Sequence, residues 1–189
     1  MRRGQALAFV GAAVAVGLAA GVLWTRRGPE ADASAPAGRP ESVAAIAGSV
    51  TLYFPGDDGR LHAETRALDT DTEAGELARR VVANLIGGPE GEGLFAPLPA
   101  TTEITSSFLG ADGTLYLDLS SAEHALPPVA GSQRELLAAY SLVNSVCGNV
   151  PRIRGVALLW NGEQRVTFGG NLDTTRPLAP DRRLVSAAS

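Results

Sequence analysis

The sequence predicts an α/β (α+β) domain with a mixed sheet of about six strands and two helices on one face of that sheet. Strand-like runs come in pairs joined by turn signals, and two segments carry apolar residues at helical spacing. These segments alternate in the order strand-strand-helix-strand-strand-helix-strand-strand. Two helices on a shared sheet face would bury the apolar positions of all of them.

The first strand pair follows Gly48. Residues 50–54 (VTLYF) are β-branched and aromatic, which is typical of a strand, and Pro55 ends the run. Residues 57–59 (DDG) have turn chemistry, and residues 61–68 then form the second strand.

Two helices are predicted, over residues 73–86 and from residue 132 to about residue 147. At each start, a hydroxyl and a glutamate three residues later have the spacing of a capping pair. The pairs are Thr70 with Glu73, and Ser132 with Glu135. Cys147 lies late in the second helix on its apolar side, so we expect a small buried hydrophobe rather than a reactive thiol.

Two further hairpins are predicted from turn signals between apolar runs. Their strands are residues 103–109 and 114–119 in the first hairpin, and 156–160 and 164–168 in the second. Asn161 and Gly162 join the second pair, and this dipeptide is typical of a type I′ turn.

Residues 5–24 carry no charge and have the length that a helix needs to cross a bilayer. We interpret them as an uncleaved signal-anchor, with a cleaved signal peptide as the alternative. With the N-terminus in the cytoplasm, the protein would be a single-pass protein of the cell membrane with its C-terminal domain extracytoplasmic. The predicted organisation is a tip and anchor at 1–27, an Ala/Pro/Gly linker at 28–48, a domain at 49–178 and a tail at 179–189.

The charge is unevenly distributed along the chain. Residues 41–132 hold fourteen acids and four arginines, a net of −10, whereas residues 134–183 hold seven arginines and four acids, a net of +3. A pI near 5.2 without a basic patch argues against nucleic acid as a partner. One cysteine and two histidines cannot form a zinc cluster, so we predict no metal and no cofactor, and no small-molecule ligand is indicated.

The ordered landmarks of residues 50–177 resemble the GerMN domain of bacterial sporulation and germination proteins. They are Leu52-Tyr53-Phe54, Gly88-Pro89, Gly93-Leu94, Leu98-Pro99, Leu117-Asp118-Leu119-Ser120, Glu135-Leu136, Tyr140, Val143-Asn144-Ser145, Gly162, Gly169-Gly170-Asn171-Leu172-Asp173 and Pro177. The resemblance implies a non-enzymatic, membrane-tethered, extracytoplasmic domain with a fold like the ring-building motifs of envelope channels. This chain has one such domain, and it has Val22 where a lipid-bearing cysteine would stand.

The leading functional prediction is an interaction or assembly module of a bacterial envelope complex, with envelope proteins or further copies of itself as partners. Its possible interaction surface comprises Trp160, Arg152, Arg154 and Arg165. The alternative is a tethered module that binds a ligand or cell-wall glycan, with Trp160 as a stacking surface. A hydrolase would need a catalytic triad, and we predict no catalytic residues in this sequence. We expect the two histidines, His62 and His124, to be surface residues.

Overall fold

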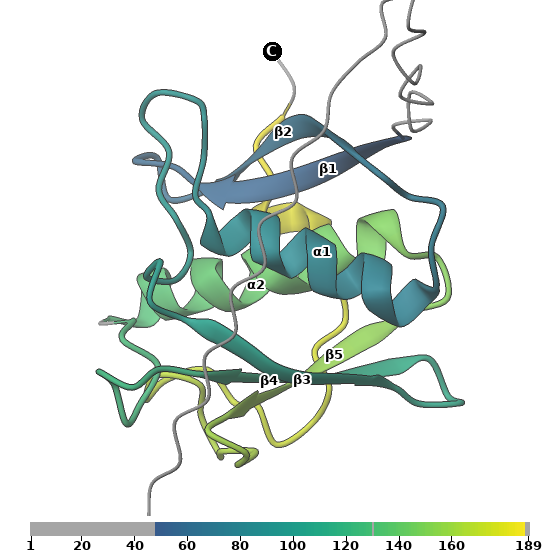
Figure 1. Cartoon of the computed structure of the whole chain (residues 1–189). Coiled ribbons are helices and arrows are strands. Elements are labelled where there is room, and N and C mark those ends of the chain that lie inside the picture. The colour runs from purple at the N-terminus through teal and green to yellow at the C-terminus, as the bar shows by residue number, and fades with distance from the viewer. Residues whose placement is uncertain (1–47, 130, 188–189) are drawn as a thin grey trace, which may run out of the picture. The chain divides into compact units, whose positions relative to one another are not determined.

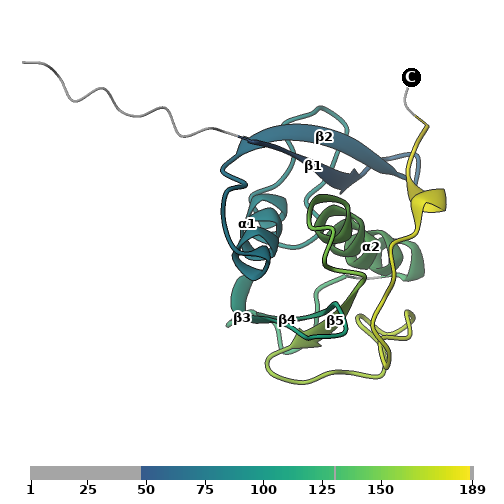
Figure 2. The same cartoon turned by 90° about the vertical axis from the view of Figure 1, so that its right-hand side faces the viewer.

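The computed structural model describes residues 48–129 and 131–187, which form three layers. A two-stranded sheet lies on one side, two helices lie in the middle, and a three-stranded sheet lies on the other side (Figures 1 and 2). The strands are β1 (Gly48–Pro55), β2 (Leu61–Leu68), β3 (Glu103–Leu109), β4 (Thr114–Ser120) and β5 (Gly155–Trp160). The helices are α1 (Ala74–Ile86) and α2 (Ser132–Asn149), and a short 3-10 helix, η1, follows at Arg182–Leu184.

The two sheets are paired differently. β1 and β2 form an antiparallel hairpin whose register runs without a shift from Gly48–Leu68 to Pro55–Leu61. In the other sheet the order is β3-β4-β5, with β3 antiparallel and β5 parallel to β4. A parallel neighbour needs a long crossover, and α2 is that crossover between β4 and β5.

The core lies on both sides of the helix layer. Alternate residues of β1 and of β4 point inward and are almost completely buried, as the pleat of a strand requires. These residues are Val50, Leu52 and Phe54 in β1, and Leu115, Leu117 and Leu119 in β4. Because α2 is covered from both sides, it is buried around most of its circumference, including two serines at Ser141 and Ser145.

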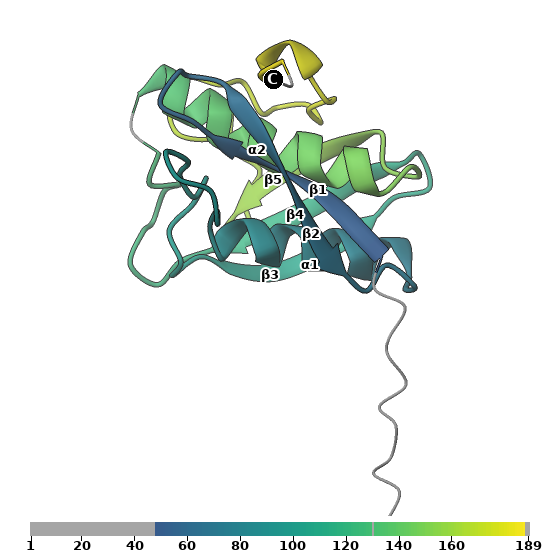
Figure 3. The ribbon, with the colours of Figure 1, turned by 90° about the horizontal axis from the view of Figure 1, so that it is seen from above.

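The predicted single sheet with both helices on one face is therefore wrong, and α2 supplies the reason. Asn149 Oδ1 accepts a hydrogen bond from the Thr51 N–H at 2.9 Å, and its Nδ2 donates to the Thr51 carbonyl at 2.7 Å. Ser145 accepts from the Tyr53 N–H at 2.9 Å, and Ser141 donates to the Tyr53 carbonyl. The hairpin crosses over the helices (Figure 3), and these side chains occupy the β1 edge that another strand would need.

The predicted sixth strand, residues 164–168, is also absent from the described part of the chain. The turn before it forms as expected, with positive φ at both Asn161 (52°) and Gly162 (81°). Across this turn the only pairing among the described residues is a bridge between Trp160 and Glu163. The chain then turns back on itself through a bridge between Thr167 and Asp173. The β5 edge is paired instead with Leu178.

Neither predicted capping pair forms. No side chain caps α1 at Glu73, and the N-cap residue of α2 is Gly131 (φ 89°), again without a side-chain cap. Among residues 48–129 and 131–187, no helix is both long enough and apolar enough to cross a membrane. The predicted anchor at residues 5–24 lies outside the described residues.

Candidate functional site: a cleft at the start of α2

A cleft of about 550 Å³ lies beside the first turns of α2. Three other segments complete it: the β1–β2 turn at residues 55–59, the loop at 95–99, and residues 128–129 before α2. Segments far apart in the sequence thus converge at one end of the molecule. Cavities of this volume are in the range that holds small ligands or short peptide segments.

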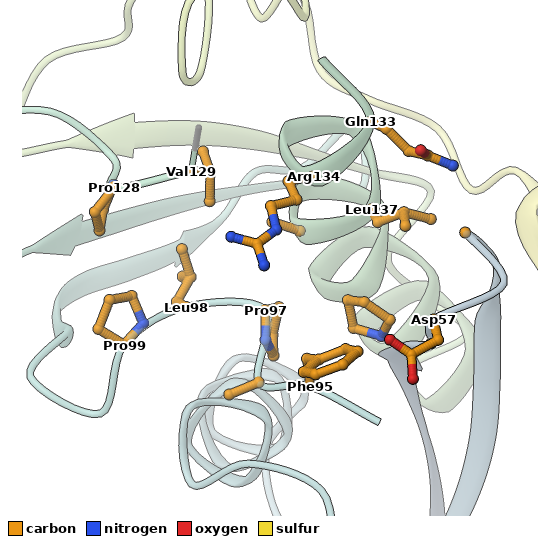
Figure 4. A pocket seen from close by; sticks show the side chains of 15 residues that line it. Asp57, Phe95, Pro97, Leu98, Pro99, Pro128, Val129, Gln133, Arg134 and Leu137 are labelled. Carbon is orange, nitrogen blue, oxygen red and sulfur yellow. The ribbon is translucent and has the colours of Figure 1, made fainter. Parts of the chain in front are cut away.

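The cleft is lined by apolar residues, one cation, Arg134, one carboxylate, Asp57, and the amide of Gln133. Phe95 is 47% exposed although it is aromatic, and Leu98 of the same loop is buried. Pro97 and Pro99 add rigid apolar surface from the same loop. Figure 4 shows the Arg134 side chain extending from α2 into this space, between the proline loop and residues 128–129. No ion pair or side-chain hydrogen bond to another described residue engages the Arg134 guanidinium.

The next residue, Glu135, fixes the start of α2 in place. Its carboxylate is fully buried and accepts main-chain hydrogen bonds from Gly169 (2.6 Å), Asn171 (2.8 Å) and Leu172 (2.8 Å), and one from the Asn171 side chain (2.8 Å). Burial alone raises the pKa of Glu135, but these hydrogen bonds outweigh it and hold the pKa below its ordinary value. The carboxylate therefore ties α2 to the loop at 169–172 and so orients the turn that carries Arg134.

Gly169 is the residue that permits this close approach. A Cβ on Gly169 would lie 2.6 Å from Val129 Cγ2 and 2.9 Å from the Val129 carbonyl oxygen. Since Val129 also lines the cleft, the loop at 169–172, the start of α2 and the cleft wall pack as one unit.

The predicted interaction residues lie elsewhere and do not come together. Trp160 is 1% exposed; its indole packs edge-on against Phe168 and donates to the His124 carbonyl, so it offers no stacking surface. Arg152 and Arg154 are exposed before the start of β5. Arg165 follows the other end of β5 and pairs with Glu163 at 3.5 Å.

The two histidines have no nucleophile beside them. His62 in β2 pairs with Asp58 at 2.9 Å, and His124 lies 4.0 Å from Glu123 in the loop after β4. In the described residues no serine, threonine or cysteine is hydrogen-bonded to a histidine ring, and no cluster of His, Cys, Asp or Glu has metal-site geometry. Cys147 is half-buried, and burial raises the pKa of its thiol to about 11.

Comparison with known proteins identifies the family of the domain. The family model described as "Sporulation and spore germination" matches residues 51–166, which is more than half of the chain. The chain belongs to this family, Germane. The resemblance to GerMN domains seen in the sequence is thereby confirmed.

Solved structures agree with the Germane fold. The chain is similar to the first GerMN domain of the sporulation protein GerM from Bacillus subtilis, with 21% identity and a TM-score of 0.55, over 72% of this chain and 98% of that one. It is also similar to the tandem GerMN domains of GerM, with 19% identity and a TM-score of 0.54, over 72% of this chain and 47% of that one. The Germane domain described here thus spans about half of the tandem structure. No curated protein matches the chain.

Sequence reasoning missed the cleft because its lining is spread over four segments. One local signal pointed to it. Arg134 lies in the first turn of α2, where a cation opposes the positive end of the helix dipole, so its placement there is unfavourable unless it serves another purpose.

Proposed function

We propose that this Germane chain is a non-enzymatic, membrane-tethered, extracytoplasmic interaction module of a bacterial envelope complex that acts in sporulation or germination. Family membership supports the biological setting, and the fold shared with the GerM domains supports an assembly role. In the described residues no serine, threonine or cysteine is hydrogen-bonded to a histidine ring, which favours binding over catalysis. The predicted segment at residues 5–24 would supply the tether.

The observation that carries the proposal is the Arg134 guanidinium, which lies in the cleft beside apolar residues and has no ion-pair or hydrogen-bond acceptor of its own in the described structure. A cation in apolar surroundings gains most from a carboxylate that arrives with the partner, since hydrogen bonds to charged groups are the stronger ones. We therefore assign the cleft to an extended protein segment that brings an acidic side chain next to an apolar one. Phe95 and Leu98 would receive the apolar side chain.

Photo-crosslinking of the full-length protein in cells tests this proposal. A benzophenone amino acid replaces Phe95 in the cleft, and in the control it replaces Phe108, which is 67% exposed on the opposite sheet. We expect a discrete envelope protein to be captured from position 95 and not from position 108. Capture of the same proteins from both positions would contradict a role for the cleft.

A second candidate function is binding of a cell-wall fragment, and the exposed Phe95 ring favours it. Aromatic rings stack on flat apolar faces of ligands, and Arg134 could hold a carboxylate of a peptide stem. Retention of the protein on purified cell wall, lost on Phe95→Ala, together with no protein captured from position 95, would replace the leading proposal by this one.

A further inference from the structure

The edges of the two sheets differ in how they are protected. The β1 edge is closed by the side chains of α2, and the β5 edge by reciprocal main-chain hydrogen bonds between Val156 and Leu178 (2.9 and 2.8 Å). β3 has a register shift between Ile104 and Ser106, and an irregular edge of this kind resists pairing. Among the strands of the described residues, only β2 presents a regular edge, and at its first residue the Leu61 carbonyl accepts from the Ser186 N–H at 2.8 Å.

Beyond Leu61 the β2 edge has no partner among the described residues. The outward groups of Thr51 and Tyr53 bond α2, so both residues are non-hydrogen-bonded positions of the hairpin. Their opposite residues in β2 are Thr65 and Ala63, whose N–H and C=O groups must therefore also point away from β1. The same alternation places Ala67 on this edge. All three β2 residues are exposed and have small side chains.

We propose that this edge pairs with the same edge of a second copy of the chain, with β2 antiparallel to β2 and Thr65 opposite Thr65. The pairing would continue each two-stranded sheet into one of four strands, through about six main-chain hydrogen bonds from Ala63, Thr65 and Ala67 of both copies. The Leu61 end, where Ser186 is already bound, stays outside the paired stretch.

The side chains on the other face of β2 select this occupant and this register. Glu64 and Arg66 flank Thr65 and form an ion pair at 2.9 Å within one chain. Both side chains are mostly buried against the loop at residues 88–91: Glu64 accepts from the Gly91 N–H at 2.7 Å, and Arg66 donates to the Gly88 carbonyl at 2.8 Å. With Thr65 at the centre, Glu64 of each copy lies opposite Arg66 of the other, so unlike charges meet across the new strand pair. A slip of two residues either way would set Glu64 against Glu64, or Arg66 against Arg66, and like charges directly opposite each other destabilise a sheet.

This geometry is two-fold and self-complementary, so it closes as a dimer. It is independent of the cleft, which lies at the turn end of the hairpin, and each can fail without the other.

Cysteine crosslinking of the full-length protein in its membrane tests the register, in a Cys147→Ala background. Directly opposite residues of this kind have Cα atoms about 5.5 Å apart, within the reach of a disulfide. We expect Thr65→Cys to give a crosslinked homodimer on oxidation. Ala63→Cys alone should give none, because the two copies of residue 63 would lie roughly 14 Å apart. Ala63→Cys coexpressed with Ala67→Cys should crosslink again.

Thr65→Pro is the variant that should weaken the pairing of the two β2 strands. Proline removes only the outward N–H of residue 65 and is tolerated on an edge strand, so the domain should fold while the crosslink between positions 63 and 67 falls at least tenfold. Equal crosslinking of Thr65→Cys and Ala63→Cys would overturn the register. If Thr65→Cys formed a crosslink only to a different protein, the proposal that a second copy of the chain binds this edge would be wrong.

Discussion

Replacement of Glu135 is the sharpest test of how the cleft is held in place. The carboxylate is fully buried and serves four donors, three main-chain N–H groups and the Asn171 amide. Glu135→Ala leaves all four without their acceptor. At about 1 kcal/mol for each buried donor, the free energy of unfolding should fall by about 4 kcal/mol. That loss corresponds to a melting temperature lower by about 12 °C for a domain of this size.

Glu135→Gln removes the negative charge of this side chain and nearly keeps its size and shape. The retained oxygen can still accept from Gly169 and Leu172, but the new amide turns a donor toward Asn171, which is itself a donor. We expect a loss of about 2 kcal/mol, half that of the alanine variant. Urea unfolding of the full chain in detergent measures both losses, with Trp24→Phe so that the buried Trp160 is the only fluorescent indole.

The pH dependence follows from the lowered pKa of Glu135. A carboxyl group whose folded pKa lies below its unfolded value, 4.5, stabilises the fold at pH above 4.5. This contribution disappears as the pH falls through the folded pKa of Glu135. The difference in the free energy of unfolding between wild type and Glu135→Gln should therefore become smaller in acid. Glu92→Ala, an exposed acid, is the control. A loss below 1 kcal/mol for Glu135→Ala, or a gap that widens in acid, would refute the reasoning.

Three further predictions concern the packing of α2. Asn149→Ala removes the hydrogen bonds to both main-chain groups of Thr51, and should lower the free energy of unfolding by about 2 kcal/mol in the same urea assay; no change would mean that water closes the β1 edge equally well. Gly169→Ala should lower it by 1–3 kcal/mol, roughly the range for overpacking, because its Cβ meets Val129 at 2.6 Å, and a stabilised variant would contradict that contact. The Cys147 thiol, with its pKa raised to about 11 from 9.0, should react with a thiol reagent at pH 8 about 100-fold more slowly in the folded protein than in urea, and equal rates would show that it is exposed.

Local structure could largely be predicted from the sequence. The hairpin strand at Leu61–Leu68 and the strand at Glu103–Leu109 have the predicted bounds, and both helices end within two residues of the expected positions. Asn161 and Gly162 form the expected turn because only residues that tolerate positive φ fit it. These features depend on neighbours in the chain, which a sequence displays directly.

Features that depend on distant partners could not be predicted. Ser141, Ser145 and Asn149 look like the polar positions of an amphipathic helix, but they lie at i, i+4 and i+8 and together face the β1 edge. Glu135 has the spacing of a helix cap. Its carboxylate oxygens instead accept hydrogen bonds from a loop more than thirty residues later in the sequence. Once α2 is placed between two sheets, the single-sheet arrangement is no longer available.

The charge of Arg134 gives the most direct test of the proposed function. The measurement is the yield of the crosslinked partner from position 95 in cells, with Arg134→Glu and, as the control, with Arg152→Glu, an exposed arginine before β5. If the cleft binds an acidic segment, the yield should fall at least tenfold with Arg134→Glu and stay unchanged with Arg152→Glu. An unchanged yield with Arg134→Glu, or an equal fall with both variants, would contradict recognition by the cleft.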